Sequence, residues 1–211
     1  MRIEKRDNIV LNLAIECCFS TMLLSRFSIL TSLLSNKYKM EHLKYPIGRF
    51  KKPANIDAAT INNWITEIEE IPTLLKDLTE KLSEEDLNRT YRPDGWTIRQ
   101  VVHHVMDSHI NAYIRFKWTL TEDNPTIKAY KEALWAELPD TQKTPITISL
   151  YLLSGLHYRW SILMRSLSEE DLNRTFLHPE SGKTFSLKEM VGAYAWHGKH
   201  HLEHVKIALK G

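Results

Sequence analysis

Cysteine is scarce in this chain, and its absence from most of the sequence excludes a disulfide framework. The 211 residues include only Cys17 and Cys18, which are adjacent near the N-terminus. Adjacent cysteines rarely pair with each other, because disulfide geometry requires well-separated backbones. Disulfides persist mainly in oxidising compartments, so a reducing, cytoplasmic location is expected.

Glycine and long uncharged runs are also scarce. Seven glycines against six tryptophans and eight tyrosines favour packed helices over a β-sandwich. Within residues 9–34, Glu16 and Arg26 leave no uncharged run longer than about ten residues, whereas a membrane-spanning helix needs about 20 apolar residues. The sequence therefore predicts no association with a membrane.

The basic residues show no clustering in the body of the chain. Residues 1–39 hold six Lys and Arg against three Asp and Glu, and the remainder holds 22 against 23. A nucleic-acid-binding face needs a clustered basic stripe, which the body lacks, so nucleic acid is not an expected partner. No Gly-rich phosphate loop, nucleophile elbow or pair of catalytic carboxylates stands out either.

Residues 1–39 are expected to be an over-long gene start or a poorly ordered extension, followed by one domain over residues 40–211. Met40 and the residues after it could form the natural start. A signal peptide is the alternative, because Arg2 and Lys5 precede apolar residues. However, Glu16 interrupts the apolar region, and no clean small-residue cleavage site follows.

Apolar residues recur at spacings of three and four in four segments of the body, as amphipathic helices require. The first segment follows Asp57, a candidate N-cap, and extends towards Leu82. Pro72 lies inside it and should kink the helix or relax one turn. The third segment begins near Pro145, which suits a first helical turn.

The second and fourth segments each begin with a capping box, a Ser or Thr followed three residues later by Gln or Glu. Thr97 opens the second helix, which should end near residue 121, and Ser186 opens the fourth, which should end near residue 209. A short helix is expected around Lys128–Ala136. The apolar positions of the second helix include Ile110 and Trp118, and Leu152 is expected on the core face of the third helix.

A nine-residue sequence occurs twice without change, at residues 82–90 and at residues 167–175. Each copy joins the end of one long helix to a turn and then to a capping box. The sequence therefore predicts an all-α four-helix bundle built from two repeated helix hairpins with a long crossover between them. The acidic residues of each copy should be solvated helix starts that the helix macrodipole favours.

Histidines gather close to the C-terminus, where residues 196–204 hold four of the ten in the chain. His197 and His201 are four apart, so on a helix their rings share one face and could bind one metal ion. Their offsets from Ser186 and the offset of His104 from Thr97 differ by multiples of four. In related helices of one bundle, the three side chains should therefore point to a similar side.

Several motifs together resemble those of the DinB/YfiT-like metalloenzymes, most closely the YfiT branch of metal-dependent hydrolases. They are Gly95-Trp96-Thr97 with the following residues to His104, Asp107-Ser108-His109-Ile110-Asn111, Leu156-His157-Tyr158-Arg159-Trp160, and Trp196-His197 with His201. The resemblance covers about residues 43–210. It implies a bundle that binds one divalent metal ion through His104, His197 and His201, and a homodimer. Zinc is the expected ion, with nickel as the alternative, because both accept imidazole ligands.

Three neutral imidazoles leave one position open on a tetrahedral ion, where the pKa of a bound water can fall from 15.7 to about 7. The resemblance thus implies a metal-dependent hydrolase with a small-molecule substrate. An S-transferase that uses a low-molecular-weight thiol such as bacillithiol is the alternative, because a coordinated thiol loses its proton. A non-catalytic metal-binding stress-response bundle is a second alternative.

Other polar residues near these motifs have two interpretations each. Asp107, three residues after His104, could orient a ligand or act as a general base, or bond a neighbouring helix. Arg159 and Arg115 could bind an anionic substrate group, although pairing with surface carboxylates is favoured for each. His157 could also contact substrate, or be a hydrogen-bonded core histidine.

The remaining histidines near the motifs are not expected to bind metal. His103 lies about 100° around the helix from His104. His200 and His204 should support the ligands or lie at the surface, and the role of His109 is left open.

Overall fold

The computed structural model describes residues 38–211 and divides the chain into two compact units, residues 1–44 and Tyr45–Gly211. Of the first unit, residues 38–44 are helical. The expectations for the N-terminal extension lie almost wholly outside the described residues. The second unit contains both copies of the repeat and the C-terminal histidines.

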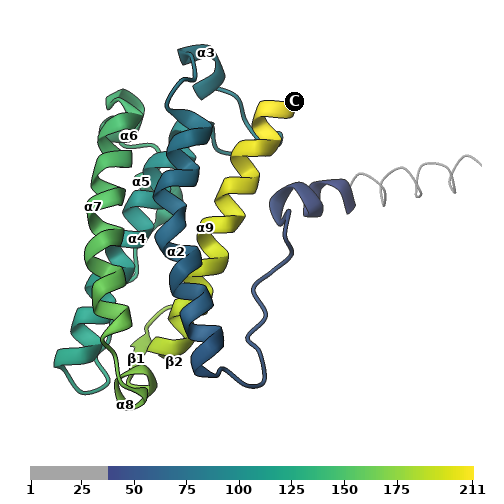
Figure 1. The fold of residues 1–211 in the computed structure, drawn as a ribbon. Coiled ribbons are helices and arrows are strands. Elements are labelled where there is room, and N and C mark those ends of the chain that lie inside the picture. Colours follow the sequence, from purple (N-terminus) through teal and green to yellow (C-terminus); the bar gives the residue numbers. More distant parts are fainter. Residues whose placement is uncertain (1–37) are drawn as a thin grey trace, which may run out of the picture. The chain divides into compact units, whose positions relative to one another are not determined.

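Four long helices form the second unit, which confirms the predicted four-helix bundle (Figure 1). They are α2 (Ala58–Thr79), α4 (Ile98–Thr121), α7 (Ile146–Arg165) and α9 (Leu187–Lys210). The main contacts join α2 to α9 and α7, and α4 to α9 and α7. The two helices of each repeat copy therefore lie diagonally opposite and do not pack as a hairpin. This arrangement makes α4 and α9 neighbours.

Each copy of the repeat forms a one-turn helix with a Ser–Asp capping box, and the two lie at opposite ends of the bundle (Figure 1). These short helices are α3 (Glu84–Leu87) and α8 (Glu169–Asn173). The backbone amide of Ile98 donates to the carbonyl of Arg89, and that of Leu187 donates to the carbonyl of Arg174, both at 3.0 Å. The identical sequences thus fold into equivalent connections.

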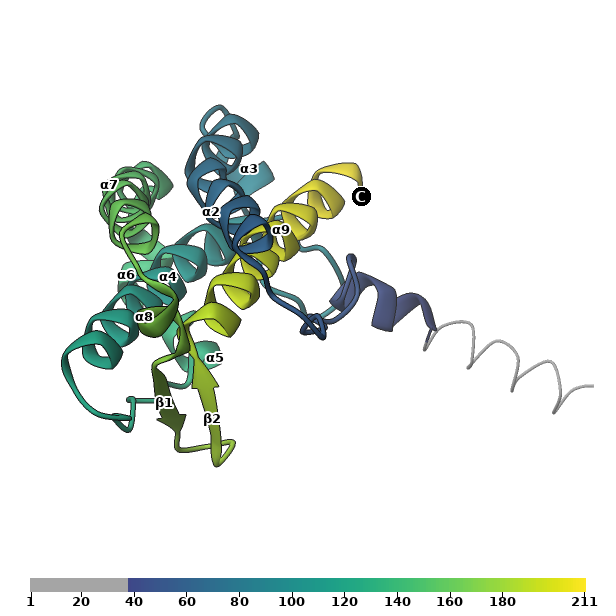
Figure 2. The ribbon, with the colours of Figure 1, turned by 60° about the horizontal axis from the view of Figure 1, so that its bottom comes forward.

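The second connection is longer than the first and contains a β-hairpin that the sequence did not predict. Strands β1 (Thr175–His178) and β2 (Lys183–Ser186) are antiparallel, with Thr175 opposite Ser186. The hairpin projects from the long helices (Figure 2). In the first copy the equivalent pair, Thr90 and Thr97, forms only an isolated bridge.

The crossover from α4 to α7 contains two short helices in place of the single one expected. They are α5 (Glu132–Trp135) and α6 (Pro139–Lys143). No described helix is both long enough and apolar enough to cross a membrane.

Two apolar clusters fill the bundle, one towards each end. One contains Ile71, Val101, Leu153 and Val205 among others, and the other contains Ile65, Phe116, Trp160 and Val191 among others. Each of the four long helices contributes to both clusters. The residues between them in α4, α7 and α9 include buried histidines, so a polar layer crosses an apolar core.

Three apolar residues of the predicted helices, of which Leu152 was expected to face the core, are substantially exposed. The exposed fractions are 39% for Ile110, 37% for Trp118 and 55% for Leu152. The expectation failed because apolar residues also occupy the outer faces of α4 and α7, so spacing alone does not identify the buried side. Helix α2 continues through Pro72 and ends at Thr79, about one turn before Leu82, where its apolar pattern ends.

Candidate metal centre

Three histidines from two neighbouring helices converge between the apolar clusters. His104 projects from α4, and His197 and His201 project from α9, with one ring nitrogen of each lying within 4.8 Å of the others. Nε2 of His104 lies 3.3 Å from Nε2 of His197. The exposed fractions of His104 and His201 are 5% and 6%, respectively.

The distance between Nε2 of His104 and Nε2 of His197 matches the coordination of a small divalent ion. Two nitrogens at about 2.0–2.1 Å from one zinc ion, at a tetrahedral angle, stand roughly 3.3 Å apart. The separation between His104 and His197 has this value. The three residues are thus able to hold one metal ion, as the ligand positions implied by the sequence resemblance require.

The helix starts set the positions of the three side chains. The hydroxyl of Thr97 accepts from the amide of Gln100, and the hydroxyl of Ser186 accepts from the amide of Glu189. Both predicted capping boxes are present. Helices α4 and α9 begin at equivalent points of the repeat and are neighbours, and His104, His197 and His201 converge between them, as their offsets from the caps predicted.

Burial keeps the three rings neutral. Burial, with a smaller contribution from the nearby His200, lowers the pKa of His104 to about 4. Burial is also the largest cause that lowers the pKa of His197 and of His201 well below the ordinary value, and neighbouring histidines add to it. A neutral imidazole has a lone pair available for a metal ion without first losing a proton.

The other histidines of the C-terminal cluster are buried, and neither lies at the surface. Nδ1 of His204 lies 3.4 Å from Nδ1 of His201, and the His204 ring stacks on Tyr91 with centroids 3.8 Å apart. His200 stacks on Trp196 with centroids 4.6 Å apart. His204 therefore lies directly beside the His201 ring.

A second pair of histidines lies behind His197, on its side away from His104. Nε2 of His109 lies 3.0 Å from Nδ1 of His197, and Nδ1 of His109 lies 2.8 Å from Nε2 of His157. Nδ1 of His157 lies 2.7 Å from the carbonyl oxygen of Ile68 in α2. Both rings are buried, and burial lowers the pKa of His157 to about 4 and that of His109 well below its ordinary value.

Comparison with known proteins identifies the family. A family model described as the DinB superfamily matches residues 67–205, which is more than half of the chain and includes all three histidines of the cluster. The chain belongs to the DinB superfamily. The match confirms the resemblance that the sequence motifs indicate.

Relatives with DinB-type sequences share most of their length with this chain. A Bacillus cereus protein named "putative metal-dependent hydrolase" is 53% identical over 166 residues, which cover 79% of this chain and 95% of the relative. A protein of Oceanobacillus iheyensis with the same description is 54% identical over 162 residues, with coverages of 77% and 93%.

Solved structures of the DinB type agree with the bundle. YfiT from Bacillus subtilis, described as a probable metal-dependent hydrolase with an unusual four-helix bundle topology, is 41% identical with a TM-score of 0.78. The alignment covers 80% of this chain and 97% of YfiT. A mycothiol-dependent maleylpyruvate isomerase is 14% identical with a TM-score of 0.56, covering 69% of this chain and 60% of that one, and shares the fold alone.

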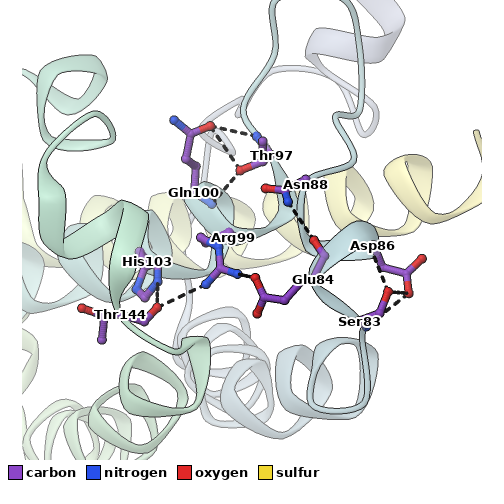
Figure 3. A network of polar contacts seen from close by, with 9 residues as sticks. All are labelled: Ser83, Glu84, Asp86, Asn88, Thr97, Arg99, Gln100, His103 and Thr144. Carbon is purple, nitrogen blue, oxygen red and sulfur yellow. Dashed lines mark hydrogen bonds and ion pairs between the residues drawn. The ribbon is translucent and has the colours of Figure 1, made fainter.

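In this DinB bundle, His103 lies outside the ligand cluster, as its helical angle indicates. Its Nε2 donates to the carbonyl of Thr144, so its Nδ1 accepts from the Ser149 hydroxyl at 2.8 Å. The guanidinium of Arg99 also donates to Thr144 and pairs with Glu84 of the first repeat copy (Figure 3). Glu84 thus ties α3 to α4, although its side chain is 81% exposed.

Asp107 is half-buried, and its carboxylate makes no hydrogen bond or ion pair with a histidine among the described residues. Burial raises its pKa to about 6, and the nearby Asp140 adds to this effect. Ser108 takes the place beside the ligands, because its Oγ lies 3.4 Å from Nε2 of His197. Trp96 packs over His104, with ring centroids 4.5 Å apart.

The residues predicted to contact substrate lie elsewhere. Both ring nitrogens of His157 are used within the protein, which matches its core-histidine interpretation. Arg159 is exposed on α7, where its guanidinium lies 5.8 Å from the ring centroid of Tyr113. Arg115 was expected to pair with a surface carboxylate, but it is buried and donates to the backbone carbonyl of Lys128.

No role was predicted for His109, although its spacing along the helix indicates that it is buried. His109 continues the spacing of Val105, Ala112 and Phe116, which are all buried in α4. A histidine in such an inward position needs a hydrogen-bond partner inside the core. The spacing could have predicted that His109 is buried, but not that its partners come from α7 and α9.

Proposed function

We propose that the protein is a metal-dependent hydrolase with one divalent ion held by His104, His197 and His201. The observation that carries the proposal is the convergence of three imidazoles, of which His104 and His201 are buried and His197 is half-buried, with one ring nitrogen of each within 4.8 Å of the others. The names of relatives more than 50% identical support the same activity. The predicted homodimer and the cytoplasmic location stay predictions.

Zinc is the ion that we propose for this site. Catalytic zinc sites commonly use three protein ligands and keep one position open, whereas structural zinc sites are usually closed by four, often with cysteines. No cysteine lies in residues 19–211. A three-histidine site in this bundle therefore suits catalysis better than a purely structural role.

When bound, the ion supplies Lewis acidity, which lowers the pKa of a water molecule and favours its attack on a substrate. The residues of the chain prepare the site for this chemistry. Trp96 packs against the His104 ring, with centroids 4.5 Å apart, and restricts the orientation of that ring. The Ser108 hydroxyl, beside His197, is placed to hydrogen-bond an oxygen atom near the ligands.

The test compares hydrolysis by zinc-loaded wild-type protein and by His104→Ala, on a panel of activated carboxylic and phosphoric esters. His103→Leu is the matched control, because His103 is equally buried on the same helix and lies outside the cluster. We expect hydrolysis in the wild type and the control, and none above background in His104→Ala. Equal hydrolysis in all three proteins would contradict the proposal.

A parallel assay distinguishes thiol transfer from hydrolysis. The same zinc-loaded proteins are mixed with monochlorobimane, with and without bacillithiol. The proposal expects no conjugation that depends on both the thiol and His104. Metal-dependent conjugation together with absent ester hydrolysis would replace the hydrolase proposal by the S-transferase alternative.

A further inference from the structure

The His109–His157 pair lies outside the three proposed ligands, yet it connects one of them to a backbone carbonyl. We propose that these two histidines are positioning residues, which fix the tautomer of His197 so that its bare Nε2 faces the metal site. This inference rests on the proposed function only in the identity of the ligand. The tautomers themselves follow from the hydrogen bonds of the metal-free protein.

The chain of hydrogen bonds starts at the carbonyl oxygen of Ile68, which can only accept. Nδ1 of His157 lies 2.7 Å from this oxygen and must therefore carry a proton. A neutral imidazole has one N–H group, so Nε2 of His157 is bare. Nδ1 of His109, 2.8 Å away, must then donate to it.

The same logic continues to the metal site. With its proton on Nδ1, His109 has a bare Nε2, which lies 3.0 Å from Nδ1 of His197. His197 therefore donates from Nδ1, and its Nε2 is left bare. That nitrogen is the one that lies 3.3 Å from Nε2 of His104. One carbonyl group of α2 thus determines the proton positions in three rings from three helices.

The packing around the pair also fixes the ring orientations. The rings of His109 and His157 are nearly parallel, with an interplanar angle of 7° and centroids 4.9 Å apart. Trp160 meets both of them edge-on, at 5.9 and 6.0 Å. Tyr194 meets the His109 ring edge-on from α9 at 5.2 Å. A ring enclosed in this way cannot turn to exchange its two nitrogens without disturbing the core.

The far end of this series of hydrogen bonds, at Ile68, indicates that the series orients a ligand and does not conduct protons. The oxygen of Ile68 is an amide carbonyl, which does not take up a proton near neutral pH, so a proton that entered at His197 would have no acceptor at the far end. An extra proton on either ring would also bring two N–H groups face to face. Both features favour one fixed arrangement of protons.

Nitrogen-15 NMR of the metal-free wild-type protein tests the tautomers directly. Long-range proton–nitrogen correlations within each imidazole ring show which nitrogen carries the proton. We expect His109, His157 and His197 all to be in the Nδ1–H form, which is the minor form of histidine in water. An Nε2–H form at His109 or His197 would overturn the inference, whatever the metal or the reaction proves to be.

Substitution of His157 tests the consequence for metal binding. In His157→Leu the proton of His109 loses its acceptor, and we expect zinc affinity, measured by chelator competition, to fall by about 10–100-fold. His157→Gln should recover much of this loss, because its amide can donate to Ile68 while its carbonyl accepts from His109. His103→Leu is the matched control for removal of a buried histidine and should keep wild-type affinity.

Two results would refute the positioning role. One is wild-type zinc affinity in His157→Leu, and the other is equal loss of affinity in His157→Leu and His103→Leu, which would indicate a general structural effect. If His157→Leu does not fold, the comparison of His157→Gln with the wild type by zinc affinity and by NMR decides. Failure of ester hydrolysis in the wild type would leave these tests unaffected.

Discussion

Acid should unfold the metal-free protein at a pH at which most proteins stay folded, because the core contains several imidazoles that resist protonation. Burial is the largest cause that lowers the pKa of His104, His157 and His200 to about 4. His109, His197 and His201 are shifted well below the ordinary value in the same direction. Five of the six are at most 6% exposed, so solvent screens their shifts little, whereas His197 is half-buried and its shift is screened more.

The sign and size of the effect follow from proton linkage. A histidine of the unfolded chain has a pKa of about 6.5, so between pH 6.5 and 4 the unfolded state binds protons that the folded state does not. Stability is therefore complete above pH 6.5 and falls as the pH drops through this window. Each ring contributes about 1.4 kcal/mol per pH unit, so three rings with a pKa of about 4 give roughly 4 kcal/mol per unit. A typical domain stability of about 5–15 kcal/mol would largely be lost before pH 4.

Urea denaturation of the metal-free protein, followed by circular dichroism from pH 7.5 to 5, measures this slope. The His157→Leu variant lacks one of the three rings and should show a slope smaller by about 1.4 kcal/mol per unit below pH 6.5. A wild-type slope below about 1.4 kcal/mol per unit would mean that no more than one histidine resists protonation. That result would refute the buried, neutral state of the cluster.

Three further substitutions test particular contacts. In Gly198→Ala, the new Cβ would lie 2.6 Å from Cδ1 and Cγ1 of Ile71. The cost of overpacking, about 1–3 kcal/mol, should outweigh the gain in helix propensity of about 1 kcal/mol. Thermal denaturation should therefore show a variant less stable than the wild type. Arg99→Met should lower the free energy of unfolding by about 1.5–3 kcal/mol, and Glu84→Gln by less than about 1 kcal/mol, both measured by urea denaturation. The two differ because Arg99 is buried and Glu84 is 81% exposed. Equal losses in the two variants would contradict this reasoning. If Asp107 is the general base, wild-type hydrolysis should fall with acid near the Asp107 pKa of about 6, and Asp107→Asn should retain zinc but lose hydrolysis. Unchanged hydrolysis in Asp107→Asn would exclude that role.

Local signals in the sequence were sufficient to predict the helix starts and the shared helix face of His197 and His201, because both depend on short-range spacing, whereas His104 was added to the ligand set by the family resemblance. Asp57, Thr97 and Ser186 all cap helices as expected, since a capping side chain bonds amides only two or three residues away. The spacing of His197 and His201 likewise needs only one helical turn.

Features that depend on which helices are neighbours could not be predicted in the same way. The diagonal arrangement of the repeat copies places α4 between α7 and α9, and only this arrangement lets His109 contact both His157 and His197. The exposed fraction of Leu152 depends on the same arrangement, since apolar residues lie on both the inner and the outer face of α7 and spacing alone does not distinguish them. The β-hairpin lies beyond the identical repeat, which ends at Thr175, so the repeat did not predict it, and the equivalent segment of the first copy forms only one bridge.

The most direct test of the metal site is the metal content of purified protein by elemental analysis, after zinc loading and gel filtration. We predict about one zinc ion per chain in the wild type and in the His103→Leu control, and almost none in His197→Ala. Loss of zinc in His197→Ala alone would support the site formed by His104, His197 and His201. Full zinc occupancy in His197→Ala would contradict it.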